Sequence, residues 1–182
     1  MAIRKAAPEL YDPLHHHTSW TRLLFRFLFD PAIGLHSRGP RAPQVGIGRG
    51  GLAPAVYLSH RMDLPLVSID HSARIASFGP ALIAILAERA RAGDHLLFVE
   101  DINDSGKTIG EIRAALAALG AVDSNIRFAV LLDNSLSSQR VDYRARTIDR
   151  SINKDWFVFP WEAMAPREKL VEEAMEVPER IG

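Results

Sequence analysis

The organisation of this chain is decided by one stretch, Leu96-Leu97-Phe98-Val99-Glu100-Asp101-Ile102-Asn103-Asp104-Ser105-Gly106-Lys107-Thr108. Its first part is apolar, is rich in strand-forming residues and stops at two adjacent carboxylates. A third carboxylate follows three residues later, and a small, hydroxyl-rich turn then begins a helix. This layout predicts acidic groups at the carboxyl end of a buried strand, beside a helix N-terminus whose backbone N–H groups can bind an anion. Because carboxylates bind hydroxyls or a metal ion while such a turn binds phosphate, the stretch predicts a site for a phosphorylated sugar.

The composition of the chain excludes several classes of protein. A length of 182 residues fits one domain that buries its own core. Lys+Arg and Asp+Glu both total 22, so no overall positive charge favours nucleic acid or an anionic membrane as a partner. The absence of cysteine excludes disulfides, thiol nucleophiles and cysteine–zinc sites. No apolar run approaches the roughly 20 residues that span a bilayer, and the charged N-terminal residues do not form a signal peptide. We therefore expect a cytoplasmic protein without a membrane segment.

Apolar strand patterns alternate with helical patterns along most of the chain. We expect strands over 44–47, 64–69, 95–100, 126–132, 146–148 and 156–159, and helices over 20–29, 53–62, 80–91, 106–119 and 166–175. Residues 31–43 hold three prolines and two glycines and are predicted to form a loop. The alternation indicates an α/β fold with a mostly parallel central sheet flanked by helices. In such sheets ligands bind at the carboxyl ends of the strands, where the acidic stretch lies.

The N-terminal residues 1–17 are predicted to form an irregular arm. The arm contains His15-His16-His17. Three histidines could bind a metal ion, but adjacent residues of a regular element do not all point to one place. A solvated arm is therefore the favoured interpretation.

Two nucleotide-binding motifs match parts of the chain incompletely. Gly46–Gly51 has the letters of the dinucleotide fingerprint G-x-G-x-x-G, and Asp70 follows about twenty residues later, but the preceding strand is only a few residues long. Ser105–Thr108 has the end of a P-loop, yet that motif needs glycine where this chain has Asp101. A carboxylate there would repel the phosphates, so the P-loop interpretation fails and the dinucleotide interpretation stays weak.

A third interpretation accounts for all of these residues together. The run from Val99 to Thr108 resembles the phosphoribosyl-pyrophosphate signature of type I phosphoribosyltransferases, above all of the branch that acts on 6-oxopurines. Gly48-Arg49-Gly50-Gly51-Leu52 is similar to the pyrophosphate loop of that family. The run from Asp155 to Glu162 is similar to the base-binding tail of the hypoxanthine, xanthine and guanine phosphoribosyltransferases. Ser19-Trp20 also looks like these relatives, so the resemblance runs from about residue 18 to 162.

The resemblance implies a fold and a division of the chain. It implies the type I phosphoribosyltransferase fold, with a small hood built from the N- and C-terminal segments. We expect the N-terminal arm at 1–17, the phosphoribosyltransferase domain with its base-binding hood at 18–165, and a C-terminal helix and tail at 166–182. The apolar face of the predicted helix 20–29 and the habit of the family indicate a homo-oligomer, a dimer or a tetramer.

The resemblance also assigns roles to residues. Asp104 is implied to be the general acid/base that faces the purine N7; from the residues alone it could equally be a helix N-cap. Glu100 and Asp101 are implied to hold the ribose hydroxyls and, with Glu162, Mg²⁺. The 5′-phosphate is implied to bind the turn made by Asp104, Ser105, Gly106, Lys107 and Thr108. Pyrophosphate is implied to bind Arg49, Gly50, Gly51 and, in the flexible loop 70–79, Arg74. The base is implied to meet Asn134, Trp156 and Phe157.

The implied activity is transfer of the phosphoribosyl group from phosphoribosyl pyrophosphate to a purine base. These relatives usually carry a lysine after the fourth strand that donates to the purine O6, whereas this chain has Asp133-Asn134. Lys154, the lysine nearest to Asn134 in the sequence, is the alternative cation. If Asn134 recognises the base, Asn134→Lys should improve the use of guanine or hypoxanthine. Two alternatives remain: a non-catalytic regulatory protein that binds the same sugar phosphate, and a nicotinamide enzyme that uses Gly46–Gly51.

Overall fold

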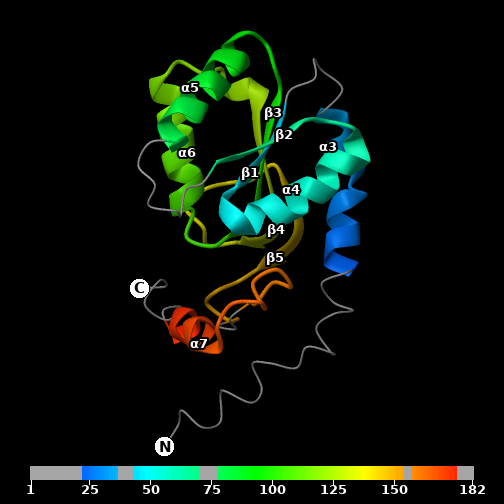
Figure 1. Cartoon of the computed structure of the whole chain (residues 1–182), viewed down its shortest axis with the longest axis vertical. Coiled ribbons are helices and arrows are strands. Elements are labelled where there is room, and N and C mark those ends of the chain that lie inside the picture. Colours follow the sequence, from blue (N-terminus) through cyan, green and yellow to red (C-terminus); the bar gives the residue numbers. More distant parts are fainter. Residues whose placement is uncertain (1–21, 37–42, 70–77, 154–156, 176–182) are drawn as a thin grey trace, which may run out of the picture.

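A five-stranded parallel sheet forms the centre of the molecule (Figure 1). The computed structural model describes residues 22–36, 43–69, 78–153 and 157–175. The strands lie in the order β2-β1-β3-β4-β5, and every neighbouring pair is parallel. Their bounds are β1 Gln44–Ile47, β2 Leu66–Ile69, β3 Leu96–Asn103, β4 Ile126–Asn134 and β5 Tyr143–Ile148. The predicted α/β fold with a parallel sheet is confirmed.

Helices cover both faces of this sheet. The labelled helices are α3 Pro31–His36, α4 Gly48–Met62, α5 Phe78–Arg91, α6 Lys107–Ala118 and α7 Arg167–Met175, with a 3₁₀ turn η1 at Asp123–Asn125. Residues 22–28 are also helical. Figure 1 shows α5 and α6 on one face of the sheet and α4 and α3 on the other. Among the described residues no helix is both long enough and apolar enough to cross a bilayer.

The alternating side chains of β3 build the two halves of the core. Leu96 and Phe98 pack into the layer beneath α5 and α6, whereas Leu97 and Val99 pack into the layer beneath α4. All four side chains are at most 2% exposed. Burying each such side chain contributes about 1.5–3 kcal/mol. Strand β3 is therefore fixed from both sides, and the polar residues at its end are held on a rigid support.

One predicted loop contains a helix. The range 31–43 was expected to be a loop because of its prolines, but α3 occupies its beginning. The reason is local, because the Asp30 carboxylate accepts a hydrogen bond from the Ala32 N–H at 2.9 Å and Pro31 suits the first turn of a helix. Ile33, 1% exposed, anchors the helix in the core.

Three further differences from the sequence prediction concern the segments near the site. Helix α4 begins at Gly48 rather than near residue 53, so the glycine run is its first turn and not a loop. Strand β3 continues through Asn103 because it stays paired with β4, which places both adjacent acids inside the strand. Residues 157–159, predicted as part of a strand, form no strand pairing.

Candidate active site

The candidate site lies where the chain reverses its direction across the sheet. From β1 the chain moves outward to β2, and β3 then lies on the opposite side of β1. The connections that leave β1 and β3 therefore diverge, and ligands bind at such a point in open parallel sheets. The first turn of α4 follows β1, and the acidic residues lie at the end of β3. The structure thus brings the two motifs to one edge of the sheet.

Glu100 and Asp101 form a pair of carboxylates at that edge. The pKa of Glu100 is raised well above its usual range, first by burial and then by the charge of Asp101. Burial also raises the pKa of Asp101, whose side chain is 6% exposed. Backbone N–H groups relieve part of this cost, since the Ile102 N–H donates to the Asp101 carboxylate at 2.8 Å. Ionisation of these two carboxyls therefore costs more free energy here than it would in water.

Glycines allow the first turn of α4 to lie directly against this pair. A Cβ on Gly50 would lie 2.1 Å from Oδ2 of Asp101, and a Cβ on Gly51 would lie 2.1 Å from the carbonyl oxygen of Val99. The Gly51 N–H also donates to the Glu100 carboxylate. Arg49 is exposed in the same turn. Because the first N–H groups of a helix have no partner inside it, this turn can receive an anion beside the acidic pair.

The acidic pair also suits a magnesium ion. Mg²⁺ binds through one or two carboxylates and fills its other positions with waters and substrate oxygens. Within the described ranges no ion pair neutralises Glu100 or Asp101, and no three acidic or histidine side chains gather into a metal site. Glu162 does not join the pair in such a group; its Oε2 accepts a hydrogen bond from the Phe159 N–H at 3.1 Å. The donor set that fits Mg²⁺ is therefore the two carboxylates of β3.

The segment 157–165 reaches the acidic pair through Trp161. The indole N–H of Trp161 is buried and has no hydrogen-bond partner among the described residues. It lies near enough to Asp101 to lower the pKa of that carboxyl. The ring of Trp161 stacks on Phe159, with 5.1 Å between the ring centroids. Trp161 and Phe159 are thereby held beside the acidic pair.

The predicted phosphate turn follows β3 and leads into α6. Gly106 has a φ of 86°, a conformation that favours glycine, and a Cβ there would lie 2.5 Å from the Ser138 Oγ. The Ser138 hydroxyl donates to the Ser105 carbonyl at 2.8 Å, and the Ser138 N–H donates to the same oxygen at 3.2 Å. Ser105 and Lys107 are exposed, and Thr108 is half-buried. The turn is thus fixed from behind by the loop after β4, while two of its side chains face solvent.

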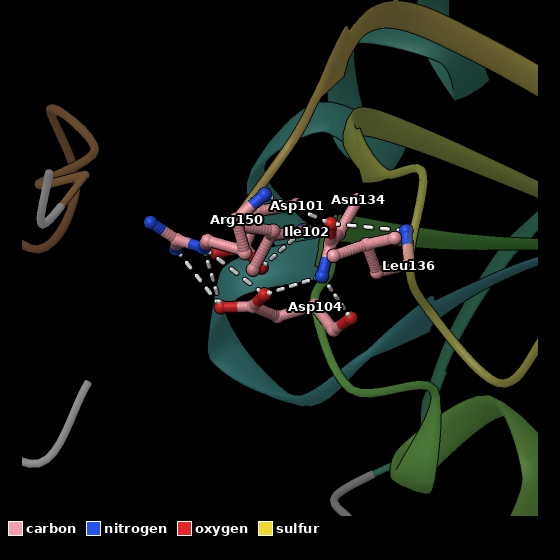
Figure 2. Close-up of polar contacts among 6 residues, drawn as sticks. All are labelled: Asp101, Ile102, Asp104, Asn134, Leu136 and Arg150. Carbon is pink, nitrogen blue, oxygen red and sulfur yellow. Dashed lines mark hydrogen bonds and ion pairs between the residues drawn. The ribbon is translucent and has the colours of Figure 1, made fainter. Parts of the chain in front are cut away.

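Asp104 is held by Arg150 rather than used as a helix cap. Helix α6 has Gly106 at its N-cap and no side-chain cap. Instead the Arg150 guanidinium donates to the Asp104 carboxylate through Nη2 at 2.8 Å and through Nε at 3.1 and 3.2 Å. Figure 2 shows the guanidinium lying beside this carboxylate. The sequence left two roles open for Asp104, a general acid/base and a helix N-cap. The structure excludes the N-cap role.

Asn134, at the end of β4, ties this ion pair to the sheet. Its Nδ2 donates to the backbone oxygen and to Oδ1 of Asp104, at 3.1 and 3.3 Å. Its Oδ1 accepts from the N–H groups of Leu136 and Arg150, at 3.1 and 3.3 Å. Figure 2 draws these contacts among the three polar side chains. Asn134 is 8% exposed, so its amide group is used to build the site from behind.

Of the predicted base-binding residues, only Phe157 and Asn134 belong to the described part of the chain. The Phe157 ring lies 5.1 Å from the central carbon of the Arg150 guanidinium. Trp156, Lys154, Arg74 and the histidine run at 15–17 lie outside the described residues. The structure thus joins the tail to Asp104 through Arg150.

Sequence reasoning missed Arg150, whose side chain is 2% exposed. The comparison with the family pattern led to Asn134 as an uncharged hydrogen-bond donor and to Lys154 as the alternative cation. A signal was available, since all strands of a parallel sheet end at one edge and Arg150 follows β5 by two residues. Any charged residue just after a strand was therefore a candidate.

Comparisons with known proteins agree with this geometry. The family model described as a phosphoribosyl transferase domain matches residues 45–166. The xanthine-guanine phosphoribosyltransferase of Cereibacter sphaeroides is 30% identical, over 80% of this chain and 86% of that protein. A purine phosphoribosyltransferase from Pyrococcus horikoshii has a solved structure that matches with a TM-score of 0.55 and 28% identity, over 80% of this chain and 92% of that one.

A second similarity concerns a much shorter stretch. Over 39 residues the chain is 46% identical to a sphingolipid delta(4)-desaturase of Drosophila melanogaster, which is 21% of this chain and 12% of the desaturase. So small a share of that protein carries no argument about fold or activity. The family model, in contrast, spans β1 to Pro166, just before α7, and includes the end of β3, the first turn of α4 and Arg150. The chain belongs to the phosphoribosyl transferase domain family.

Proposed function

We propose that this protein transfers the 5-phosphoribosyl group from phosphoribosyl pyrophosphate to a purine base of the hypoxanthine, xanthine or guanine type, releasing pyrophosphate. The observation that carries the proposal is the grouping at one sheet edge of an acidic pair, a glycine-rich helix start and a positioned Asp104. The whole-length similarity to a xanthine-guanine phosphoribosyltransferase supports it. Such an enzyme is a pentosyltransferase of nucleotide salvage.

The sugar phosphate would bind through three groups of residues. Glu100 and Asp101 accept hydrogen bonds from the 2′- and 3′-hydroxyls, because ionised carboxylates are acceptors only. The N–H groups of the turn at 105–108 bind the 5′-phosphate. Arg49 and the first N–H groups of α4 bind the pyrophosphate, and Arg74 adds a charge there.

Mg²⁺ is proposed as the cofactor of this half of the site. Glu100 and Asp101 would hold the ion, and Glu162 is proposed to assist in metal binding from outside this pair. When bound, the ion supplies positive charge to the sugar hydroxyls and pyrophosphate oxygens. The raised pKa values of both carboxyls are the expected property of a site that is completed by a cation.

The reaction breaks the bond between C1 and the pyrophosphate oxygen and forms a bond between C1 and a purine nitrogen. Bond breaking precedes bond making, so positive charge develops on the ribose ring, and the protein acts mainly by positioning and electrostatic stabilisation. Asp104, placed at the purine N7, takes or returns the proton that the base exchanges as its nitrogen reacts. Trp156 and Phe157 are proposed to contact the purine ring, and Asn134 supports the base end through Asp104.

The direct test is to incubate the protein with phosphoribosyl pyrophosphate, Mg²⁺ and a panel of bases. Formation of a nucleoside monophosphate with hypoxanthine, xanthine or guanine is the expected result. Binding of the sugar phosphate without turnover of any base would overturn the proposal and favour a regulatory protein. Omission of Mg²⁺ should abolish turnover, and rescue by added Mg²⁺ checks the cofactor.

We propose a homo-oligomer in the cytoplasm, a dimer or a tetramer. Phe25 and Phe29 are 56% and 58% exposed, and their rings stack on each other at 5.7 Å. Exposed aromatic pairs of this kind are typical of subunit contacts. Light scattering on the eluting protein measures the number of subunits, and a monomer would contradict the proposal.

A further inference from the structure

Arg150 has the position of a residue that selects the base. It follows β5, and its guanidinium is buried while lying against the carboxylate of Asp104. On its other side lies the ring of Phe157, 5.1 Å from the central guanidinium carbon. Its backbone N–H is fixed by the Asn134 Oδ1 at 3.3 Å. Contacts with Asp104, Phe157 and Asn134 therefore hold Arg150 between the proposed acid/base and the proposed base-binding segment.

A buried ion pair of this kind is weak evidence for a role in stability. A buried ion pair gains little net free energy over well-packed apolar side chains, because removing both charges from water costs about as much as their attraction returns. The Arg150–Asp104 pair is nevertheless bidentate and almost fully enclosed on the arginine side. A functional reason for keeping the pair is therefore the better explanation.

We propose that Arg150 is the residue that positions Asp104 and makes the site prefer bases with an exocyclic oxygen beside the nitrogen that faces Asp104. This inference rests on the proposed function. A guanidinium carries five N–H donors and no acceptor. In a purine, N7 and the substituent on C6 lie on the same edge of the ring. A base whose N7 faces Asp104 therefore turns its C6 substituent toward the cation that holds Asp104.

The chemistry of the C6 substituent then decides which base binds. The oxygen of hypoxanthine accepts a hydrogen bond from a guanidinium, and the positive charge strengthens that bond. The amino group of adenine offers donors only, so it faces other donors and a positive charge. A site of this kind rejects the wrong substituent strongly, because the buried polar groups would be left unpaired. Arg150 thus supplies the positive charge for which the sequence offered Lys154.

The test compares Arg150→Met and Arg150→Lys with the unmodified protein, using hypoxanthine and adenine. Arg150→Met should raise the KM for hypoxanthine about ten- to a hundredfold and lower the preference for hypoxanthine over adenine by a similar factor. The KM for phosphoribosyl pyrophosphate should change less than about threefold, since the sugar site lies on the acidic pair. Arg150→Lys, which keeps the charge, should retain the preference with a several-fold higher KM for hypoxanthine.

The matched control is Arg144→Met. Arg144 also lies on β5 and pairs with an aspartate of β4, Asp133, at 3.6 Å, but its side chain is 48% exposed. This control should leave unchanged the KM for hypoxanthine, the KM for phosphoribosyl pyrophosphate and the preference for hypoxanthine over adenine.

Two results would overturn the inference. One is an unchanged preference for hypoxanthine over adenine in Arg150→Met. The other is an equal rise in the KM for hypoxanthine and in the KM for phosphoribosyl pyrophosphate, which a merely structural role would produce. If Arg150→Met does not fold, Arg150→Lys decides, because an unchanged KM for hypoxanthine in that variant contradicts the proposal. Failure of the proposed function gives a different result, since the unmodified protein would then form no nucleotide from any base.

Discussion

Glu100 and Asp101 lie only a few residues before Asp104, yet the surroundings of this pair differ sharply from those of Asp104. On β3, Asp101 is buried and Glu100 is half-buried, no ion pair among the described residues neutralises either carboxylate, and the pKa of each carboxyl is raised. Asp104 is instead held in a fork by Arg150 and bonded by Asn134. No ion pair in the part of the chain that the structure describes neutralises Glu100 or Asp101, whereas Asp104 is paired with Arg150.

This difference separates the two tasks of the site. A carboxylate pair without its own cation is suited to bind what a ligand brings, namely hydroxyl groups and a metal ion. A carboxylate whose orientation is fixed before the ligand arrives is suited to act on a reacting atom, because no reorganisation is then needed. We therefore propose that ligands complete the sugar half of the site, whereas contacts within the protein build the base half.

Asp104→Asn breaks the base half and should have the largest effect. The substitution keeps the size of the side chain but removes the proton acceptor, so kcat should fall about 10²- to 10⁴-fold. The KM for phosphoribosyl pyrophosphate should change by only a few-fold. Steady-state kinetics with both substrates measure the two effects separately.

The control for this experiment is Asp94→Asn. Asp94 pairs with Arg89 at 2.7 Å and precedes β3, at the opposite edge of the sheet. It should leave kcat unchanged. An unchanged kcat in Asp104→Asn would remove Asp104 from the mechanism.

Gly50→Ala breaks the sugar half in the same way. Its new Cβ would lie 2.1 Å from Oδ2 of Asp101, so either the carboxylate or the first turn of α4 must move. A displacement of about 1 Å at such a site can cost on the order of a hundredfold, and we expect the KM for phosphoribosyl pyrophosphate to rise about ten- to a hundredfold. Calorimetric titration with the sugar phosphate and Mg²⁺ measures the affinity directly.

Gly110→Ala on α6 is the matched control. The three atoms nearest to a Cβ there belong to the flexible Gln139 side chain, and the first of them, Nε2, lies at 3.3 Å. The exchange of glycine for alanine within a helix should stabilise the fold by about 1 kcal/mol without changing affinity. Equal effects of the two variants would show that Gly50 is not fitted against Asp101.

Asn134→Lys tests whether the base half depends on its supporting amide. If Asn134 recognised the base, this substitution would improve the use of guanine or hypoxanthine, but the contacts of Asn134 lead us to expect the reverse. Lysine has no acceptor for the N–H groups of Leu136 and Arg150, and it adds a second cation beside the guanidinium. Leaving such groups unpaired costs about 1–3 kcal/mol. Urea unfolding should show this loss, and a variant of unchanged stability with better base use would restore the earlier expectation.

The part of the site predicted from sequence is the part that is contiguous in sequence. Val99 to Thr108 supply a strand end, an acidic pair and a helix start within ten positions, and each has a local physical signature. The parallel sheet followed from the alternation of apolar runs and helices, and both the fold and the family were confirmed. Local chemistry was sufficient for these features.

Arg150 could not be found in this way, because its role depends on a contact across 46 residues of sequence. An arginine after a short terminal strand has no local signature that separates a buried partner of Asp104 from a surface charge. The start of α4 at Gly48 was missed for a related reason. Glycines usually disfavour a helix, but here they permit the close approach to β3 that makes the first turn favourable.

Glu100→Gln gives the smallest expected change and tests the charge of the pair itself. An acid whose folded-state pKa is raised contributes stability that is present below its unfolded pKa and is lost as the pH rises through the folded pKa. The unliganded protein should therefore lose stability from the ordinary range of glutamate, near 4.5, upward. Glu100→Gln should escape this loss, so its melting temperature should exceed that of the unmodified protein by a margin that grows from pH 5 to pH 8. Each kcal/mol recovered corresponds to about 2–4 °C for a domain of this size.

The same charge should act with the opposite sign on ligand binding. Both carboxyls must lose their protons before they can hold Mg²⁺, so binding of the sugar phosphate with Mg²⁺ should strengthen as the pH rises and should release protons. Glu100→Gln should bind more weakly and release fewer protons, as measured by calorimetry in buffers of different ionisation enthalpy. Glu88→Gln, at an exposed position of α5, is the control. A margin in melting temperature that stays constant between pH 5 and pH 8 would mean that burial does not perturb the pair, and the contrast with Asp104 would then rest on hydrogen bonding alone.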